Sequence, residues 1–145
     1  AIFNEDDQTL NTKTKLALEN GLVAIFCVGE TLQEREAGKV EEVLAGQLSK
    51  GLAGISSEEV IIAYEPVWAI GTGVTATPQQ AQEAHAFIRK FIGENLELNS
   101  EQTSILYGGS VKPENVEDLL SCKDIDGGLV GGAALNAASY LGLHI

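Results

Sequence analysis

Short apolar segments that alternate with longer segments of helical periodicity constrain the fold of this chain more than any other feature. Apolar runs of this length are typical of strands buried on both faces, and such strands are parallel when helices join them. We therefore predict one α/β domain over residues 1–145, with a parallel sheet and helical crossovers. We expect strands at 22–28, 60–64, 104–107 and 128–130, and helices at 4–20, 33–51, from 77 to at least 92, 113–121 and 136–145.

Two of the predicted helices carry clear local signals. Apolar residues recur every four positions from Val40 to Leu52, which gives the second helix one apolar face. Thr77 is a good cap for the third helix, Pro78 suits its first position, and Gln80 completes a capping box.

The segment that follows the predicted strand 60–64 has the features of a covered site. Glu65 comes directly after the strand, and Pro66 keeps the chain extended there. Residues 67–70 are apolar, and a Gly-Thr-Gly triplet then allows hinge angles. A carboxylate under such a loop is typical of a general base in a site that excludes water. These residues alone leave a simpler alternative open, a buried loop with an ion-paired glutamate.

Glycines follow three of the four predicted strands. Because the carboxyl ends of parallel strands meet at one edge, we expect nearby main-chain N–H groups to converge there on a phosphate. The candidate groups belong to Gly71, Ser110, Gly131 and Gly132. Backbone N–H groups bind phosphate without a lysine, and loops after the last two strands of a βα barrel commonly do so. The alternative is that these glycines merely let strands turn into helices.

Charge and cysteine usage narrow the classes of function. The formal net charge of −12 argues against nucleic acid and anionic membranes as partners. The longest apolar run, 22–28, is too short to span a bilayer, and the first residues do not resemble a signal peptide. Cys27 and Cys122 are far apart and match no metal or redox spacing, so we expect a reducing, cytoplasmic location. His85 lies on the apolar face of the third helix, where we expect a core or supporting role.

Several segments at predicted strand ends resemble motifs of the triosephosphate isomerase family. They are Tyr64-Glu65-Pro66-Val67-Trp68-Ala69-Ile70-Gly71-Thr72-Gly73, Ile105-Leu106-Tyr107-Gly108-Gly109-Ser110-Val111, Asp124-Ile125-Asp126-Gly127-Gly128-Leu129-Val130-Gly131-Gly132-Ala133, and Cys27-Val28-Gly29-Glu30. The resemblance covers essentially the whole chain, in the family's order. It implies a (β/α)8 TIM barrel, of which this chain supplies about half, from the helix after the fourth strand to the eighth βα unit.

The resemblance also implies roles for individual residues. It implies that Glu65 is the general base. It also implies that the substrate phosphate is bound by the main-chain N–H groups of Gly71, Ser110, Gly131 and Gly132. Arg89 and Asp124 resemble a structural ion pair of the family. Val74 and Ala134 depart from the usual Lys and Ser, and neither change removes a group of known chemistry.

The family interconverts dihydroxyacetone phosphate and glyceraldehyde 3-phosphate through an enediolate, in glycolysis and gluconeogenesis. The resemblance therefore implies a small phosphorylated triose as substrate, no cofactor or metal, and a cytoplasmic homodimer. The family's active-site lysine and electrophilic histidine precede the matched motifs, and neither His85 nor His144 fits the histidine motif. We accordingly expect little or no activity from the isolated chain.

Two alternatives stay open beside the isomerase interpretation. One is a catalytically inactive half-barrel fragment that acts as a folding or assembly unit, by self-association or by pairing with an amino-terminal half. The other is a different phosphate-binding βα-barrel enzyme. That enzyme would share the last two glycine clusters, but it has no reason to carry the segment 65–68 ahead of a glycine lid.

Overall fold

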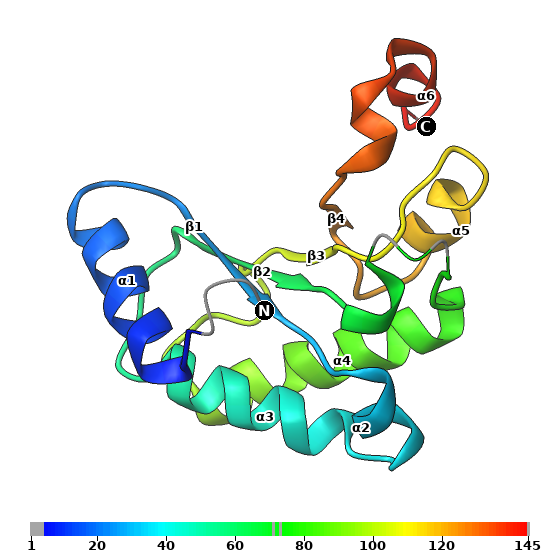
Figure 1. Ribbon diagram of the computed structural model, residues 1–145. Helices are drawn as coiled ribbons and strands as arrows, with labels where there is room; N and C mark the ends of the chain where they lie inside the picture. The colour runs from blue at the N-terminus through cyan, green and yellow to red at the C-terminus, as the bar shows by residue number, and fades with distance from the viewer. Residues whose placement is uncertain (1–4, 71, 73, 145) are drawn as a thin grey trace.

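A computed structural model describes residues 5–70, 72 and 74–144, and its centre is a four-stranded parallel sheet (Figure 1). The strands are β1 (Ala24–Val28), β2 (Val60–Tyr64), β3 (Ile105–Tyr107) and β4 (Gly127–Gly128), and they lie side by side in chain order. Every neighbouring pair is parallel. The predicted α/β fold with a parallel sheet is confirmed, and β2 has the predicted bounds.

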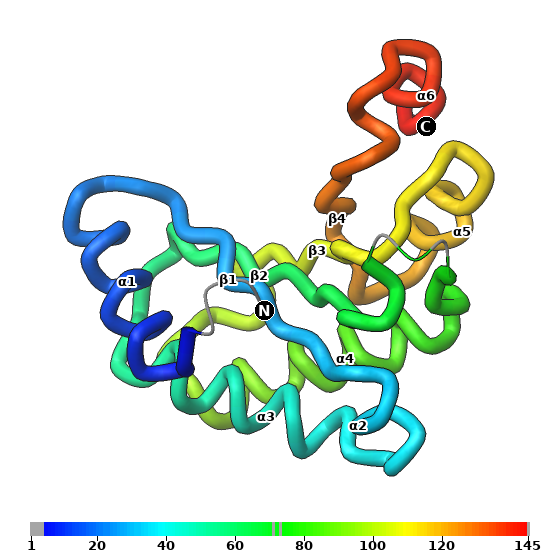
Figure 2. The backbone as a smooth tube through the Cα atoms, in the orientation of Figure 1, coloured from blue at the N-terminus to red at the C-terminus, as the bar shows by residue number. Residues whose placement is uncertain are grey.

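Helices connect each strand to the next, and one further helix precedes the first strand and another follows the last. They are α1 (Asp7–Glu19), α2 (Leu32–Glu36), α3 (Val40–Gly51), α4 (Pro78–Asn95), α5 (Val116–Leu120) and α6 (Ala137–Leu141), with short 3-10 turns η1 (Val67–Ala69) and η2 (Gly132–Leu135). Helices α3 and α4 pack against each other along one side of the sheet (Figure 1). Figure 2 shows the segment after β4 running away from these two helices.

The main core lies between the sheet and helices α3 and α4. Ile62 of β2 and Ile105 of β3 are fully buried there, as are Leu44 and Leu48 of α3 and Ile88 of α4. The predicted apolar stripes account for these contacts. No helix in the described part of the chain is long and apolar enough to cross a bilayer.

The structure corrects the prediction of one helix over 33–51. The segment forms two helices, α2 and α3, and Gly38 lies between them with φ +69°. This left-handed conformation ends a helix and favours glycine. Thr31 and Glu34 form a capping box at the start of α2 that the sequence prediction missed.

The prediction that every strand is buried on both faces is also wrong. In β1, Phe26 and Val28 are buried, whereas Cys27 is exposed and Ile25 is 47% exposed. The buried residues face the layer of α3 and α4, and the alternate residues of β1 face solvent. The predicted strands 22–28 and 128–130 are shorter than expected, because pairing covers only Ala24–Val28 and Gly127–Gly128.

The remaining predicted helices differ mainly at their ends. The predicted helix 113–121 is confined to Val116–Leu120, and 136–145 to Ala137–Leu141. Asp6 caps α1, so that helix begins later than predicted. The capping box of Thr77 and Gln80 with Pro78 in the first turn is confirmed at the start of α4.

Candidate active site

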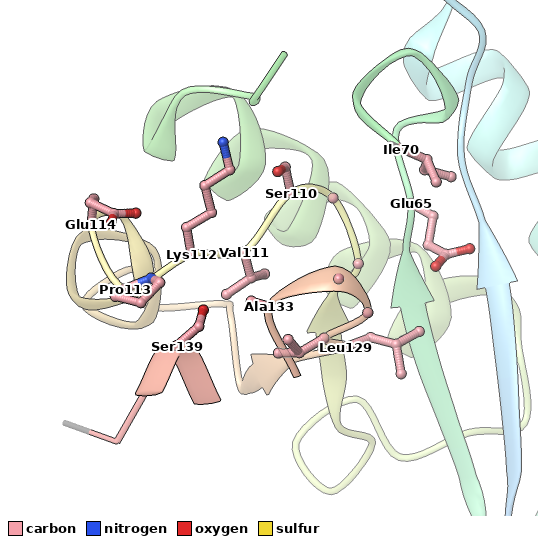
Figure 3. A pocket seen from close by; sticks show the side chains of 15 residues that line it. Glu65, Ile70, Ser110, Val111, Lys112, Pro113, Glu114, Leu129, Ala133 and Ser139 are labelled. Atoms are coloured by element: carbon pink, nitrogen blue, oxygen red, sulfur yellow. The ribbon is translucent and has the colours of Figure 1, made fainter. Parts of the chain in front are cut away.

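Loops that follow β2, β3 and β4 enclose one open pocket of about 700 Å³ (Figure 3). Glu65 lines the pocket from the end of β2, and Ser110 lines it from the turn after β3. Gly131 and Gly132 line it from the segment after β4. Four of the five residues predicted for the site are therefore brought together, because the carboxyl ends of parallel strands share an edge. The fifth, Gly71, lies outside the described residues, although the preceding Ile70 lines the pocket.

Two glycines fix the position of Glu65. Its N–H donates to the carbonyl of Val28 at 2.7 Å, which joins it to the end of β1. A Cβ at Gly29 would lie 1.8 Å from the Glu65 carbonyl oxygen, and one at Gly108 would lie 2.5 Å from Glu65 Cγ. The backbone and the side chain of Glu65 therefore each occupy space that only glycine leaves open.

The carboxylate of Glu65 points towards β1 in Figure 3, away from the turn that carries Ser110. There it lies close enough to the thiol of Cys27 to change its pKa. Cys27 is exposed as a residue, but its thiol is partly buried against Glu65. This partial burial, the negative charge of Glu65 and a hydrogen bond to it together raise the pKa of Cys27 to about 11. Glu65 forms no ion pair within the described part of the chain, so the ion-paired alternative does not describe it.

The segment after Glu65 is anchored by an ion-paired glutamate, and that glutamate is Glu30. Its buried carboxylate accepts hydrogen bonds from Arg35 Nε at 2.8 Å, Trp68 Nε1 at 2.8 Å, and the Tyr64 hydroxyl at 3.0 Å. The guanidinium of Arg35 lies over the ring of Trp68, 5.1 Å from its centroid. Burial and the charge of Glu30 raise the pKa of Tyr64, which keeps that hydroxyl a donor. This cluster ties the segment after Glu65 to the loop after β1.

The glycines after β4 are not required by packing. A Cβ at Gly131 or Gly132 would meet no described atom within 4 Å, and the φ of Gly131 is −101°. Both residues are exposed, and the carbonyl of Gly131 accepts a bond from the N–H of Ala134 at 2.9 Å. Packing therefore does not require glycine at either position, whereas the bond from Ala134 to Gly131 closes a tight turn, so the alternative of a turn-forming role stays open there.

Three residues predicted to have structural or supporting roles lie outside the pocket. The ion pair between Arg89 and Asp124 is confirmed, with Nε 3.0 Å from Oδ1. His85 is fully buried in α4 as expected for a core residue, with its ring 5.5 Å from that of Tyr64 and 6.1 Å from that of Tyr107. Neither ring nitrogen has a hydrogen-bond partner among the described residues.

His85 should make the stability of the chain depend on pH. Burial, and then the charge of Arg89, lower its pKa from 6.5 to about 4, against weaker opposite effects of Asp126 and Asp124. The folded state therefore holds His85 neutral, while the unfolded chain binds a proton below pH 6.5. Its contribution is present above about pH 6.5 and is lost as the pH falls towards about 4. Between pH 7 and pH 5 we expect the free energy of unfolding to fall by about 2 kcal/mol from this residue.

Urea unfolding of the chain and of His85→Phe at both pH values tests this expectation. The variant should lose about 2 kcal/mol less than the wild type between pH 7 and pH 5, since only the His85 contribution differs between the two chains. Equal losses would show that His85 is not buried in its neutral form.

No group of three or more His, Cys, Asp or Glu side chains in the described ranges is placed to hold a metal ion. The pocket offers the carboxylates of Glu65 and Glu114 beside residues whose main-chain N–H groups are not used by a helix or strand. A carboxylate there can accept a proton, and N–H groups of Ser110, Gly131 and Gly132 can bind an anion.

Comparisons with known proteins bear on the family of this chain. The family model described as triosephosphate isomerase matches residues 1–144. Triosephosphate isomerase from Geobacter metallireducens is 58% identical over 142 residues, which cover 95% of this chain and 57% of that protein. The protein of the same name from Leptospira interrogans is 57% identical, over 97% of this chain and 59% of its own length. The one from Bacteroides fragilis is 52% identical, over 99% and 58%.

The chain thus spans less than three fifths of the length of the relatives that it matches. Its four-stranded parallel sheet with flanking helices has the form of half a βα barrel. On the match over residues 1–144 and on these identities, the chain belongs to the triosephosphate isomerase family.

Proposed function

We propose that this chain contributes the general base and the phosphate site of a triosephosphate isomerase. The observation that carries the proposal is that Glu65, Ser110, Gly131 and Gly132 line one pocket. In the proposed reaction Glu65 removes a proton from the carbon next to the carbonyl of dihydroxyacetone phosphate and returns it to the neighbouring carbon. The amides of Gly71, Ser110, Gly131 and Gly132 hold the substrate phosphate meanwhile.

The amide-based phosphate site suits the charge of the chain. A net charge of −12 repels an anionic substrate at long range, so its binding depends on local dipoles. Exposed glycines that packing does not require leave room for a phosphate to approach the backbone closely. We further propose a cytoplasmic protein, in keeping with the free cysteines Cys27 and Cys122.

In this proposal, the isolated chain lacks the groups that donate hydrogen bonds to the developing oxyanion. We propose that the family's lysine and electrophilic histidine belong to an amino-terminal segment that these 145 residues do not include. Removing one oxyanion donor reduces kcat by about 10²–10³-fold, so the chain alone should be a poor catalyst.

The open face of β1 favours association with such a segment. Ile25 is 47% exposed, and Leu22 and Val23 before the strand are each 58% exposed. Unpaired parallel strands with exposed apolar residues are a template for pairing with another chain. The second candidate function, a catalytically inactive half-barrel that acts as an assembly unit, rests on this same surface. We propose a homodimer for the assembled protein.

Complementation separates the two candidate functions. The experiment mixes the purified chain with the unmatched amino-terminal segment of the Geobacter metallireducens relative and follows turnover of dihydroxyacetone phosphate. We expect the mixture to be at least about 100-fold more active than the chain alone, because the oxyanion donors are then supplied. Sedimentation velocity should show a complex of the two chains.

Two results would contradict this expectation in different ways. A complex that forms without turnover would favour the assembly unit over the isomerase. Rapid turnover by the chain alone that the added segment does not increase would show that the chain holds its own oxyanion donors.

A further inference from the structure

Asn115 precedes α5 at the position where asparagine usually caps a helix, yet its side chain does not cap this one. Asparagine is among the best residues at this position, because its side-chain oxygen accepts from the first free N–H groups of the helix. Side chains make such caps elsewhere in the chain, at Asp6, Thr31 and Thr77. The side chain of Asn115 is therefore committed to another task.

That task lies in the preceding turn. Asn115 Oδ1 accepts a hydrogen bond from the N–H of Lys112 at 2.8 Å, and Nδ2 donates to the carbonyl of Ser110 at 2.9 Å. One planar amide thus joins both ends of the turn 110–112. The N–H groups of Asn115 and Val116 also donate to the carbonyl of Lys112, at 3.1 and 3.0 Å.

The two hydrogen bonds restrict the orientation of Ser110. Its carbonyl is held towards Asn115, so rotation of the Ser110–Val111 peptide would break the bond from Nδ2. The Ser110 N–H lies on the preceding Gly109–Ser110 peptide, so Asn115 acts on it through the backbone of Ser110. Ser110 and Lys112 line the pocket, whereas Asn115 does not. Asn115 can therefore act on a bound anion only through the turn that it holds.

We propose that Asn115 is a positioning residue that holds the turn 110–112 and, through it, places the Ser110 N–H for an anionic ligand of phosphate type. The proposal rests on the proposed function, because it assumes that the pocket binds the phosphate of a substrate. It adds the residue that sets the geometry of the turn after β3.

The test uses the complete chain and inorganic phosphate, followed by NMR shifts of the amides of Ser110, Gly131 and Gly132. Removing both side-chain hydrogen bonds in Asn115→Ala should weaken phosphate binding by about five- to tenfold, the equivalent of a typical net hydrogen bond. The Ser110 amide should also respond less to saturating phosphate than in the wild type. A purely structural role would not change that response in a folded chain.

Two further variants separate positioning from loss of folding. Asn115→Asp keeps the acceptor for Lys112 and suits a helix start, but it loses the donor to Ser110. At 0.3 M salt, where its added charge is screened, it should keep the thermal midpoint and still bind phosphate more weakly. Asn95→Ala is the matched control. It removes an asparagine that donates to the carbonyl of Phe91 at 3.1 Å, away from the pocket, and should bind phosphate as the wild type does.

The outcomes distinguish this inference from the proposed function. Phosphate binding by Asn115→Ala and Asn115→Asp within twofold of the wild type would overturn the inference alone. A wild-type chain that shows no phosphate shifts at these amides would overturn the phosphate site, and the role of Asn115 with it.

Discussion

Replacing Arg89 by methionine is expected to lower the free energy of unfolding by about 3–5 kcal/mol. All five N–H donors of this guanidinium are used. They reach the Asp124 carboxylate at 3.0 Å, the Asp126 carboxylate at 2.6 Å, and the carbonyls of Ser100, Thr103 and Asp124 at 2.6, 3.3 and 3.1 Å. The ion pair with Asp124 is largely buried. Methionine fills the space but leaves these acceptors without their donor.

This expectation matters because Arg89 joins three parts of the fold. It projects from α4 and holds both the loop before β3 and the loop before β4. Asp126 also accepts the N–H of Ile105, the first residue of β3, at 2.6 Å. Loss of Arg89 therefore loosens the two strands whose ends carry Ser110, Gly131 and Gly132.

Urea unfolding at low temperature gives the measurement. The control is Lys50→Met, which removes an exposed ion pair with Asp7 at 3.8 Å and should change the free energy of unfolding by less than about 1 kcal/mol. A similar, small effect of both substitutions would show that the Arg89 cluster contributes no more than a surface pair.

Local patterns predicted the elements that sequence alone determines. Strand β2 was predicted with its observed bounds, because a β-branched run there is buried on almost every residue. The start of α4 was predicted because Thr77, Pro78 and Gln80 act only on their own turn. Gly38 was missed, because the helix with the apolar period that begins at Val40 was extended back through the polar residues 33–37.

The sequence predicted only those site residues that directly follow the carboxyl ends of strands. Parallel pairing alone places Glu65, Ser110, Gly131 and Gly132 at one edge. The Glu30 cluster was not predicted, since Glu30 meets Tyr64 and Trp68 across 34 and 38 positions of the chain. The exposure of Ile25 was missed for a similar reason, because the sequence does not show which faces of a strand are covered.

Replacing Glu65 by glutamine should have the largest effect on activity. In the chain complemented with an amino-terminal segment, we expect kcat to fall by about 10²–10⁴-fold, the usual contribution of a positioned base. KM should change little, because the amides proposed to hold the phosphate remain. Stability should also change little, since glutamine has nearly the same shape and Glu65 forms no ion pair with the described residues. Steady-state kinetics on the mixture provide the test.

Glu114→Gln is the matched control, because Glu114 is a second carboxylate that lines the same pocket. It does not follow a strand end, and its loss should leave kcat within a few-fold of the wild type. A comparable fall in kcat for both substitutions would point to the total charge of the pocket and not to a base at position 65. An unchanged kcat in Glu65→Gln would refute the assignment of the base.

The position of the Glu65 carboxylate can also be tested in the isolated chain, through Cys27. Burial is the main cause of the raised pKa of this thiol, and the charge of Glu65 adds to it. Glutamine removes the charge and leaves the burial, so the pKa of Cys27 should fall from about 11 while it stays above the value of a free thiol. In a Cys122→Ser background, Cys27 should then react faster with an aromatic disulfide at pH 9 in Glu65→Gln than in Glu65 chains. The same rate in both would show that the carboxylate does not lie beside Cys27, whatever its part in catalysis.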